Sequence, residues 1–229
     1  MSEDISLPIV FDGITRLFPL PNVVLFPRVT LPLHIFEPRY RQMTAHALAG
    51  DRLITMALLQ PGFEAEYDER PPLYPVACLG KILADQQMED GRYNILLRGL
   101  SRVRIVNELP GDKLYREARV ELLEEDASSS EDTEARQEEV ARRVAGWLTT
   151  LGLPPDDIVK LLQSDLPVSA LCDILAFALP LSIEFKQQLL EELHVDRRLA
   201  SLLNYLQTNE PVPKKPPGEH QFPPEFSTN

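Results

Sequence analysis

Short apolar runs within residues 17–43 are divided by Pro19, Pro21, Pro27 and Pro32, and this pattern limits the kind of sheet that the chain can form. A proline has no backbone N–H and fixes its own φ, so each one restricts regular strand pairing to the few residues beside it. We therefore predict two short strands: residues 23–26, buried on both faces, and residues 30–35, which follow a turn at Pro27 and Arg28. Proline-interrupted strands lie mostly at sheet edges, where a peptide can add alongside.

A helix is predicted to begin directly after the second of these strands. Glu37 precedes Pro38, and a proline fits the first helical position because its missing N–H has no partner there. Gly50 is expected to end the helix. Its apolar residues recur with helical spacing and form a modest stripe of Tyr40, Met43 and Ala47.

Apolar runs and period-two alternation indicate further strands along the first half of the chain. The predicted strands are residues 53–59, 76–83, 93–98, 102–105 and 118–122. A turn is predicted at Glu89, Asp90 and Gly91, and the two strands on either side of Gly99 are predicted to form a hairpin with one apolar face. Short strands with a single early helix favour a small, closed or nearly closed β structure.

The net charge of −12 is concentrated in one segment. Residues 121–139 carry nine acidic side chains and one basic one, whereas residues 1–120 carry 15 acidic and 14 basic side chains. Residues 124–134 contain no apolar side chain larger than alanine, so nothing there can offset the entropy of ordering. This composition predicts an acidic linker over residues 124–134.

Beyond the linker the apolar period changes to that of helices. Apolar stripes occur within residues 140–151, 158–162, 171–178, 182–193 and 199–206, and Ser182 is a suitable N-cap. Each stripe is short and must pack against the others, so residues 135–208 are predicted to form an α-helical bundle. Residues 1–13 are predicted to be a flexible lead-in. Residues 209–229, with six prolines in 21 positions, are predicted to be a disordered tail.

The proline-punctuated stretch, LFPLPNVVLFPRVTLPLHIFEPRYRQM, resembles the opening of the Lon protease N-terminal (substrate-binding) domain family. The resemblance continues through VACLGKILAD, YNILLRGLSRVRI and LPLSIEFKQQLLEEL and covers roughly residues 14 to 206. The IFEPRY portion is most similar to bacterial versions in which the domain stands alone. The resemblance implies an α+β fold in which a PUA-like pseudo-β-barrel over residues 14–123 is followed by the helical bundle.

The sequence contains no recognisable motif for catalysis. It contains no GxxxxGK[ST] loop to cradle phosphates, no GxSxG elbow, and no lysine in the setting of a Ser–Lys dyad. The four histidines are scattered, and none pairs with a cysteine at metal-ligand spacing. We therefore expect a module without the ATPase and peptidase of the complete protease, with no catalytic residue, no cofactor and no metal.

The family resemblance implies a non-enzymatic module that recognises polypeptides, such as unfolded or damaged chains, for a protease acting in trans. Recognition of unfolded chains requires exposed apolar side chains. A structural explanation stays open for two sets of candidate residues. Glu37 and Arg39 at the helix start can form a local ion pair, and the aromatic residues of the long loop 60–75 can pin that loop to the core. The candidate partner-binding residues are Phe36, Glu37, Arg39, Tyr40, Met43, Phe63 and Tyr67.

An alternative function is RNA binding by a basic hairpin. Arg92, Arg98, Arg102 and Arg104 fall within 13 residues that contain no acid, and related PUA-like folds include RNA binders. The near-neutral first domain argues against nucleic acid as the partner, and Glu121 on a neighbouring strand is a candidate to neutralise these arginines.

The compartment is predicted from the ends of the chain and its cysteines. The N-terminus is acidic, and no apolar run approaches the ~20 residues that span a bilayer, so neither a secretory signal nor membrane insertion is expected. Cys78 and Cys172 lie in separate predicted elements and are expected to be buried, reduced thiols. Together these features favour a cytoplasmic protein.

Overall fold

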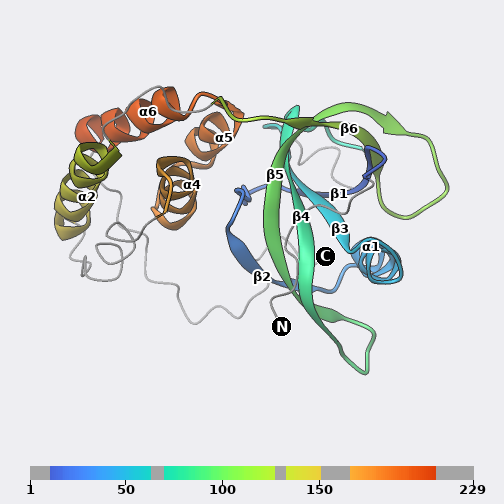
Figure 1. Cartoon of the computed structure of the whole chain (residues 1–229). Coiled ribbons are helices and arrows are strands. Elements are labelled where there is room, and N and C mark those ends of the chain that lie inside the picture. The colour runs from blue at the N-terminus through green and yellow to red at the C-terminus, as the bar shows by residue number, and fades with distance from the viewer. Residues whose placement is uncertain (1–10, 63–69, 127–132, 151–165, 210–229) are drawn as a thin grey trace. The chain divides into compact units, whose positions relative to one another are not determined.

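The computed structural model describes residues 11–62, 70–126, 133–150 and 166–209. The chain divides into two compact units, residues 1–124 and residues 125–229, which we call the β unit and the helical unit (Figure 1). The predicted helix at residues 158–162 and the predicted tail beyond Asn209 lie outside the described residues, as does most of the predicted lead-in. The α+β class expected from the sequence is confirmed.

Six strands form the sheet of the β unit. They are β1 (Ile14–Leu20), β2 (Thr30–Ile35), β3 (Leu53–Leu58), β4 (Val76–Gln87), β5 (Tyr93–Leu109) and β6 (Glu117–Leu123). The strand order is β2-β5-β4-β3-β1-β6, and β5 also pairs with β6. Five strands therefore close into a ring, and β2 is attached to β5 outside it. The ring agrees with the closed β structure that the short alternating strands favoured.

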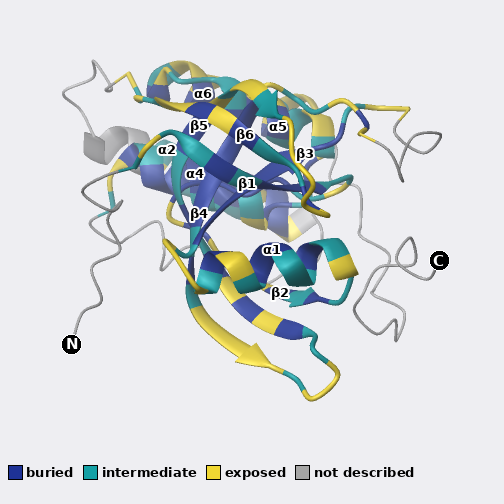
Figure 2. Ribbon diagram, turned by 90° about the vertical axis from the view of Figure 1, so that its right-hand side faces the viewer, coloured by how far each residue is buried: buried dark blue, intermediate teal, exposed yellow. Residues whose placement is uncertain are grey.

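Apolar side chains fill the ring because each strand turns one face inward. All six residues of β3 are buried, and β6 alternates between buried Ala118 and Val120 and the more exposed residues beside them. Figure 2 shows the buried strand faces in dark blue and the exposed far end of the β4–β5 hairpin in yellow. The central cluster consists of Leu17, Leu53, Ala57, Ala77, Leu79, Val103, Ala118 and Val120.

The prediction of a strand at residues 23–26 is wrong, although Leu25 and Phe26 are fully buried as expected. The segment forms no ladder. Instead, the chain turns at Arg28, where φ is 65°, and the Arg28 N–H donates to the Gly99 carbonyl at 2.8 Å. The backbone of this segment therefore hydrogen-bonds to β5 at Gly99 and does not pair along a strand.

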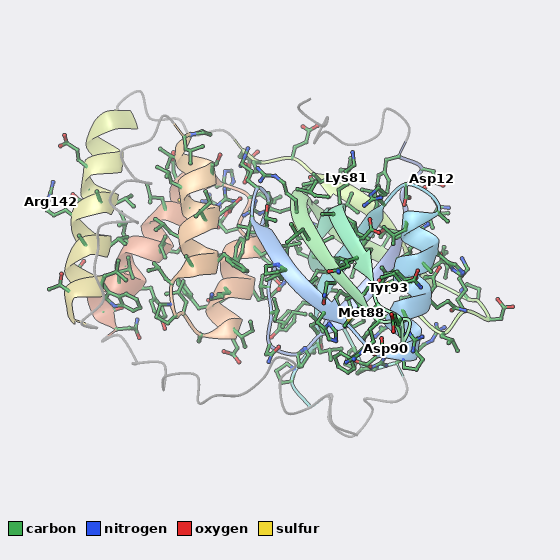
Figure 3. The ribbon with its side chains drawn as sticks, turned by 90° about the horizontal axis from the view of Figure 1, so that it is seen from below. Asp12, Lys81, Met88, Asp90, Tyr93 and Arg142 are labelled. Carbon is green, nitrogen blue, oxygen red and sulfur yellow. The ribbon has the colours of Figure 1, made fainter. Side chains whose placement is uncertain are left out.

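The predicted hairpin at Gly99 is also wrong, because β5 runs without interruption from Tyr93 to Leu109. A Cβ atom on Gly99 would lie 2.0 Å from the Phe26 carbonyl oxygen. This glycine therefore serves a close approach of two backbone segments and not a turn. The turn predicted at residues 89–91 is confirmed: Gly91 has a φ of 81° and its N–H donates to the Met88 carbonyl at 2.9 Å. Figure 3 shows Met88 and Asp90 at this tip, near Tyr93.

The first helix, α1 (Pro38–Leu48), begins and ends close to its predicted limits. Glu37 occupies the N-cap position, Pro38 lies in the first turn, and the Gly50 N–H donates to the Ala47 carbonyl at 3.1 Å. The predicted apolar stripe is confirmed, because Tyr40, Met43 and Ala47 are all buried.

The helical unit contains α2 (Thr133–Thr150), α4 (Val168–Ala178), α5 (Ile183–Glu191) and α6 (Val195–Thr208). The predicted N-cap is confirmed, since the Ser182 hydroxyl accepts a hydrogen bond from the Phe185 N–H at 3.2 Å. Apolar side chains from all four helices are buried, among them Val144, Trp147, Leu171, Leu175, Leu189 and Leu202.

A buried ionic group joins three parts of the helical unit. Arg198 and Asp173 are both fully buried, with 3.6 Å between the Arg198 Nε and an Asp173 carboxylate oxygen. Arg198 also donates to Glu125 at 2.6 Å and to the Glu192 carbonyl at 3.0 Å. Asp126 forms an isolated β-bridge with His194. Two residues of the predicted acidic linker thus have fixed partners in the helical unit, which its composition did not indicate.

No helix in the described residues is long and apolar enough to cross a membrane. Cys78 and Cys172 are buried and free, as expected.

Candidate functional site

The ends of β1 and β6 separate from each other, and this separation creates a hollow on the β unit. The two strands pair from Ile14 to Arg16 of β1. One residue further along β1, the Leu17 N–H donates to the carbonyl of Arg116, which precedes β6, at 2.8 Å. Beyond it, Pro19 has no N–H to offer, and its carbonyl accepts a hydrogen bond from the Tyr40 hydroxyl at 3.1 Å. The sequence thus ends the pairing at a proline and leaves space between β1 and the segment before β6.

The hollow has a volume of about 170 Å³. Ten residues from five parts of the β unit line it: Pro19, Arg39, Tyr40, Leu59, Arg70, Pro71, Lys113, Leu114, Tyr115 and Arg116. We call it the β1–α1 hollow. Four of its lining side chains are basic and none is acidic, in a chain whose net charge is −12.

The start of α1 supplies two of the lining residues. The Arg39 guanidinium pairs with the Glu37 carboxylate at 2.8 Å and lies over the Tyr40 ring, 4.7 Å from its centroid. The Tyr40 ring meets Phe18 edge to face with 4.5 Å between centroids. The local ion pair that the sequence allowed is therefore present, but the Glu37 side chain makes no capping hydrogen bond. Burial and the stacked guanidinium fix the position of Tyr40.

Acidic residues behind the wall hold the other basic side chains. Arg116 donates from two nitrogens to the two oxygens of Glu108, and its Nε lies 2.8 Å from one of them. Lys113 donates to Glu117 at 2.7 Å, and this hydrogen bond raises the pKa of the Lys113 ammonium, which therefore stays charged at neutral pH. Arg70 lies 3.9 Å from Glu108, which is beyond hydrogen-bond distance.

The remaining wall of the hollow is apolar. Tyr115 is buried, with its hydroxyl 2.9 Å from Nδ1 of His46, while the neighbouring Leu114 is 60% exposed. The Leu114 N–H donates to the Gln42 side chain at 2.9 Å, which fixes the backbone while its side chain faces solvent. An exposed leucine held in place beside a hollow is a suitable contact for an apolar partner.

The predicted partner-binding residues separate into three groups. Arg39 and Tyr40 line the hollow, with Glu37 paired behind Arg39. Phe36 is half-buried and lies beside His34, and Met43 is fully buried, so the Met43 side chain belongs to the core and not to a surface. Phe63 and Tyr67 lie outside the described residues.

The four arginines proposed for RNA binding do not form one basic edge. Arg92 donates to Asp90 at 2.7 Å, and this hydrogen bond lowers the pKa of Asp90, so both groups are charged near neutral pH. Arg102 is 1% exposed. Arg104 pairs in register with Glu121, the residue expected to neutralise it. The RNA-binding alternative has no support in this arrangement.

Within the described residues, no three His, Cys, Asp or Glu side chains gather as metal ligands would.

Two solved structures share the fold described above. The N-terminal domain of Mycobacterium avium complex Lon protease matches with a TM-score of 0.67 and 19% identity, over 86% of this chain and 99% of that one. A Lon N-terminal domain protein from Xanthomonas campestris matches with a TM-score of 0.62 and 24% identity, over 84% and 98%. The chain therefore has the fold of a Lon N-terminal domain.

Sequence comparison identifies the family. The model of the ATP-dependent protease La (LON) substrate-binding domain matches residues 15–208, and the chain belongs to this family. It is 33% identical over 206 residues to Lon protease 2 of Herpetosiphon aurantiacus and 31% identical over 177 residues to Lon protease 2 of Syntrophobacter fumaroxidans. The matches cover 88% and 77% of this chain but only 25% and 22% of those proteases. The family match is to the substrate-binding domain and not to the peptidase.

Proposed function

We propose that this protein is a polypeptide-binding module and that the β1–α1 hollow, with the exposed Leu114 at its side, is the place where polypeptides bind. The observation that carries the proposal is the composition of the hollow. It combines aromatic and aliphatic side chains with basic groups, and it contains Arg39 and Tyr40 from the motif that resembles the family's opening segment.

Membership of a substrate-binding domain family supports a role in recognising polypeptides. Unfolded chains present aromatic and aliphatic side chains in no fixed arrangement, so a small hollow beside an exposed leucine can accept many sequences. We propose that unfolded or damaged polypeptides are the partners, that a protease acting in trans receives them, and that this takes place in the cytoplasm. The β unit would then be the PUA-like half of the molecule, and the helices a bundle that follows it.

Replacing Leu114 by serine tests the proposal. Burying a leucine side chain contributes about 1.5–3 kcal/mol, so we expect the affinity for a reduced, carboxymethylated model protein to fall at least about tenfold. Because the side chain is 60% exposed, thermal stability should change little.

Leu122→Ser is the matched control. Leu122 is an exposed leucine of the same unit, 43% accessible, and it does not line the hollow. Binding measured by fluorescence anisotropy should be unchanged in this variant. Equal affinities in the wild type and both variants would show that polypeptides bind elsewhere, and no binding by the wild type would reject the function itself.

A further inference from the structure

The charge of the β1–α1 hollow points to an anionic group on the partner. Arg39, Arg70, Lys113 and Arg116 reach its surface, and no carboxylate is among the lining side chains. The acids that pair with them, Glu37, Glu108 and Glu117, are not part of the wall. A ligand in the hollow therefore meets basic groups whose carboxylate partners lie outside the wall.

Arg70 has the greatest capacity to bind an incoming anion. Both oxygens of Glu108 accept hydrogen bonds from Arg116, so Arg116 is the closer and better aligned partner of that carboxylate. Arg70 remains 3.9 Å from the same group, and its side chain is 51% exposed. A guanidinium has five N–H donors in a planar fork that matches a carboxylate.

Apolar side chains line the same hollow. Carbon surface comes from Tyr40, Leu59, Pro71 and Leu114. Two polar groups of these residues already have partners: the Tyr40 hydroxyl donates to the Pro19 carbonyl, and the Pro71 carbonyl accepts from Arg116 at 2.8 Å. The ligand should therefore carry an apolar side chain close to its anionic group.

The size of the hollow limits how much of a polypeptide can enter. A volume of about 170 Å³ is well below the ~300–1,000 Å³ of pockets for drug-sized ligands. That is room for about one residue. Only at a chain end does one carbon atom carry both an apolar side chain and a carboxylate.

From these observations we infer that the hollow binds the C-terminal residue of a polypeptide when that residue is apolar. Its carboxylate accepts hydrogen bonds from Arg70 and from the basic side chains beside it, and its side chain packs against Tyr40 and Leu114. This inference rests on the proposed polypeptide-binding function and specifies which part of the polypeptide is recognised.

Three fluorescein-labelled peptides test it by fluorescence anisotropy with the full chain. Each is a nonapeptide of glycine and serine that ends in leucine: the first has a free carboxylate, the second a C-terminal amide, and the third an amide with an internal glutamate. We expect the free acid to bind about tenfold or more tightly than either amide, and its affinity to fall as salt is raised.

Arg70→Gln removes the charge and leaves an amide donor. The preference for the acid over the amide should decrease several-fold in this variant, while the weak binding of the amide stays the same. Arg142→Gln makes the same chemical change on α2, where Arg142 is 71% exposed and projects from the helix (Figure 3), and should leave the preference intact.

Equal binding of acid and amide would overturn the inference, and so would binding of the glutamate peptide as tight as that of the free acid, or an Arg70→Gln variant that retains the full preference. If none of the peptides binds but the carboxymethylated model protein does, the C-terminal inference fails while the polypeptide-binding function stands. If the model protein also fails to bind, both fail.

Discussion

The two units of this protein are stabilised in different ways. In the β unit, strands far apart in sequence hydrogen-bond through their backbones, and the ring closes where β5 meets β6. In the helical unit, hydrogen bonds within each helix satisfy most of its backbone groups, and side chains pack one helix against the next, including the buried pair of Arg198 and Asp173. The β unit should therefore be sensitive to the space available to its backbone, and the helical unit to the chemistry of its side chains.

Cutting the chain in the predicted acidic linker is the strongest test of this comparison. The acidic composition of residues 124–134 predicts that mild subtilisin digestion cleaves near Ser128–Ser130 and yields one β-rich and one helical fragment. Trp147, the single tryptophan of the chain, belongs to the helical fragment and reports the melting of that fragment alone. Digestion that shortens the chain only beyond residue 209 would refute the division.

Arg198→Met should unfold the helical unit more easily and spare the β unit. The variant leaves the Asp173 carboxylate fully buried without its closest guanidinium, and losing one partner of a buried pair costs about 3–5 kcal/mol. Urea titration followed by Trp147 fluorescence measures the loss, and hydrogen exchange of the β3 and β4 amides measures the β unit.

The double variant Arg198→Met with Asp173→Leu is the control for this prediction. Replacing a buried pair by apolar side chains is often close to neutral. The double variant should therefore regain most of the stability. Equal losses in the single and double variants would mean that the arginine acts through packing and not through its charge.

Gly99→Ala should destabilise the β unit alone. The new Cβ would lie 2.0 Å from the Phe26 carbonyl oxygen, a backbone atom that can move only if the segment moves with it. Overpacking of this kind costs about 1–3 kcal/mol. We expect faster hydrogen exchange of the β5 amides and an unchanged unfolding transition of Trp147. Unchanged exchange would show that the segment around Phe26 moves to accommodate the new methyl group.

Gly146→Ala should have the smallest effect and the opposite sign. Gly146 lies exposed within α2, and a Cβ there would meet no atom within 4 Å. Alanine restricts the unfolded chain more than glycine does, so we expect a gain of about 0.5–1 kcal/mol in the Trp147-monitored unfolding free energy. A loss in this variant would indicate contacts of α2 that its glycine accommodates.

Local patterns predicted the elements whose own residues carry a clear signal. Residues 30–35 form a strand, Pro38 begins a helix, and Ser182 caps another, as the sequence indicated. Residues 23–26 did not follow the pattern, because their burial comes from a loop against Gly99 and an apolar run alone does not distinguish the two. β1 is absent from the predicted strands because Pro19 lies within it, and a proline inside a short run argues against a strand.

The site shows the same division. The sequence indicates Arg39 and Tyr40 because the motif that resembles the family's opening segment contains them. The sequence did not indicate Arg70 or the run from Lys113 to Arg116. These segments lie beside α1 only in the folded β unit, where the pairing of β1 with β6 stops at Arg16. No spacing within the chain encodes that proximity.

The attachment of β2 outside the ring has a consequence for how this chain behaves in a crowded solution. The Gly99 N–H donates to the Val29 carbonyl, and hydrogen-bonded pairs alternate along an antiparallel ladder, so the backbone groups of Thr30, Pro32 and His34 point to the outer side of β2. Pro32 is the middle one of these three residues, and its backbone nitrogen carries no hydrogen to donate. A strand from another molecule that aligned there would leave one of its own carbonyls without a partner, which makes growth of a shared sheet unfavourable. Pro32 thus protects the outer edge of β2 against aggregation.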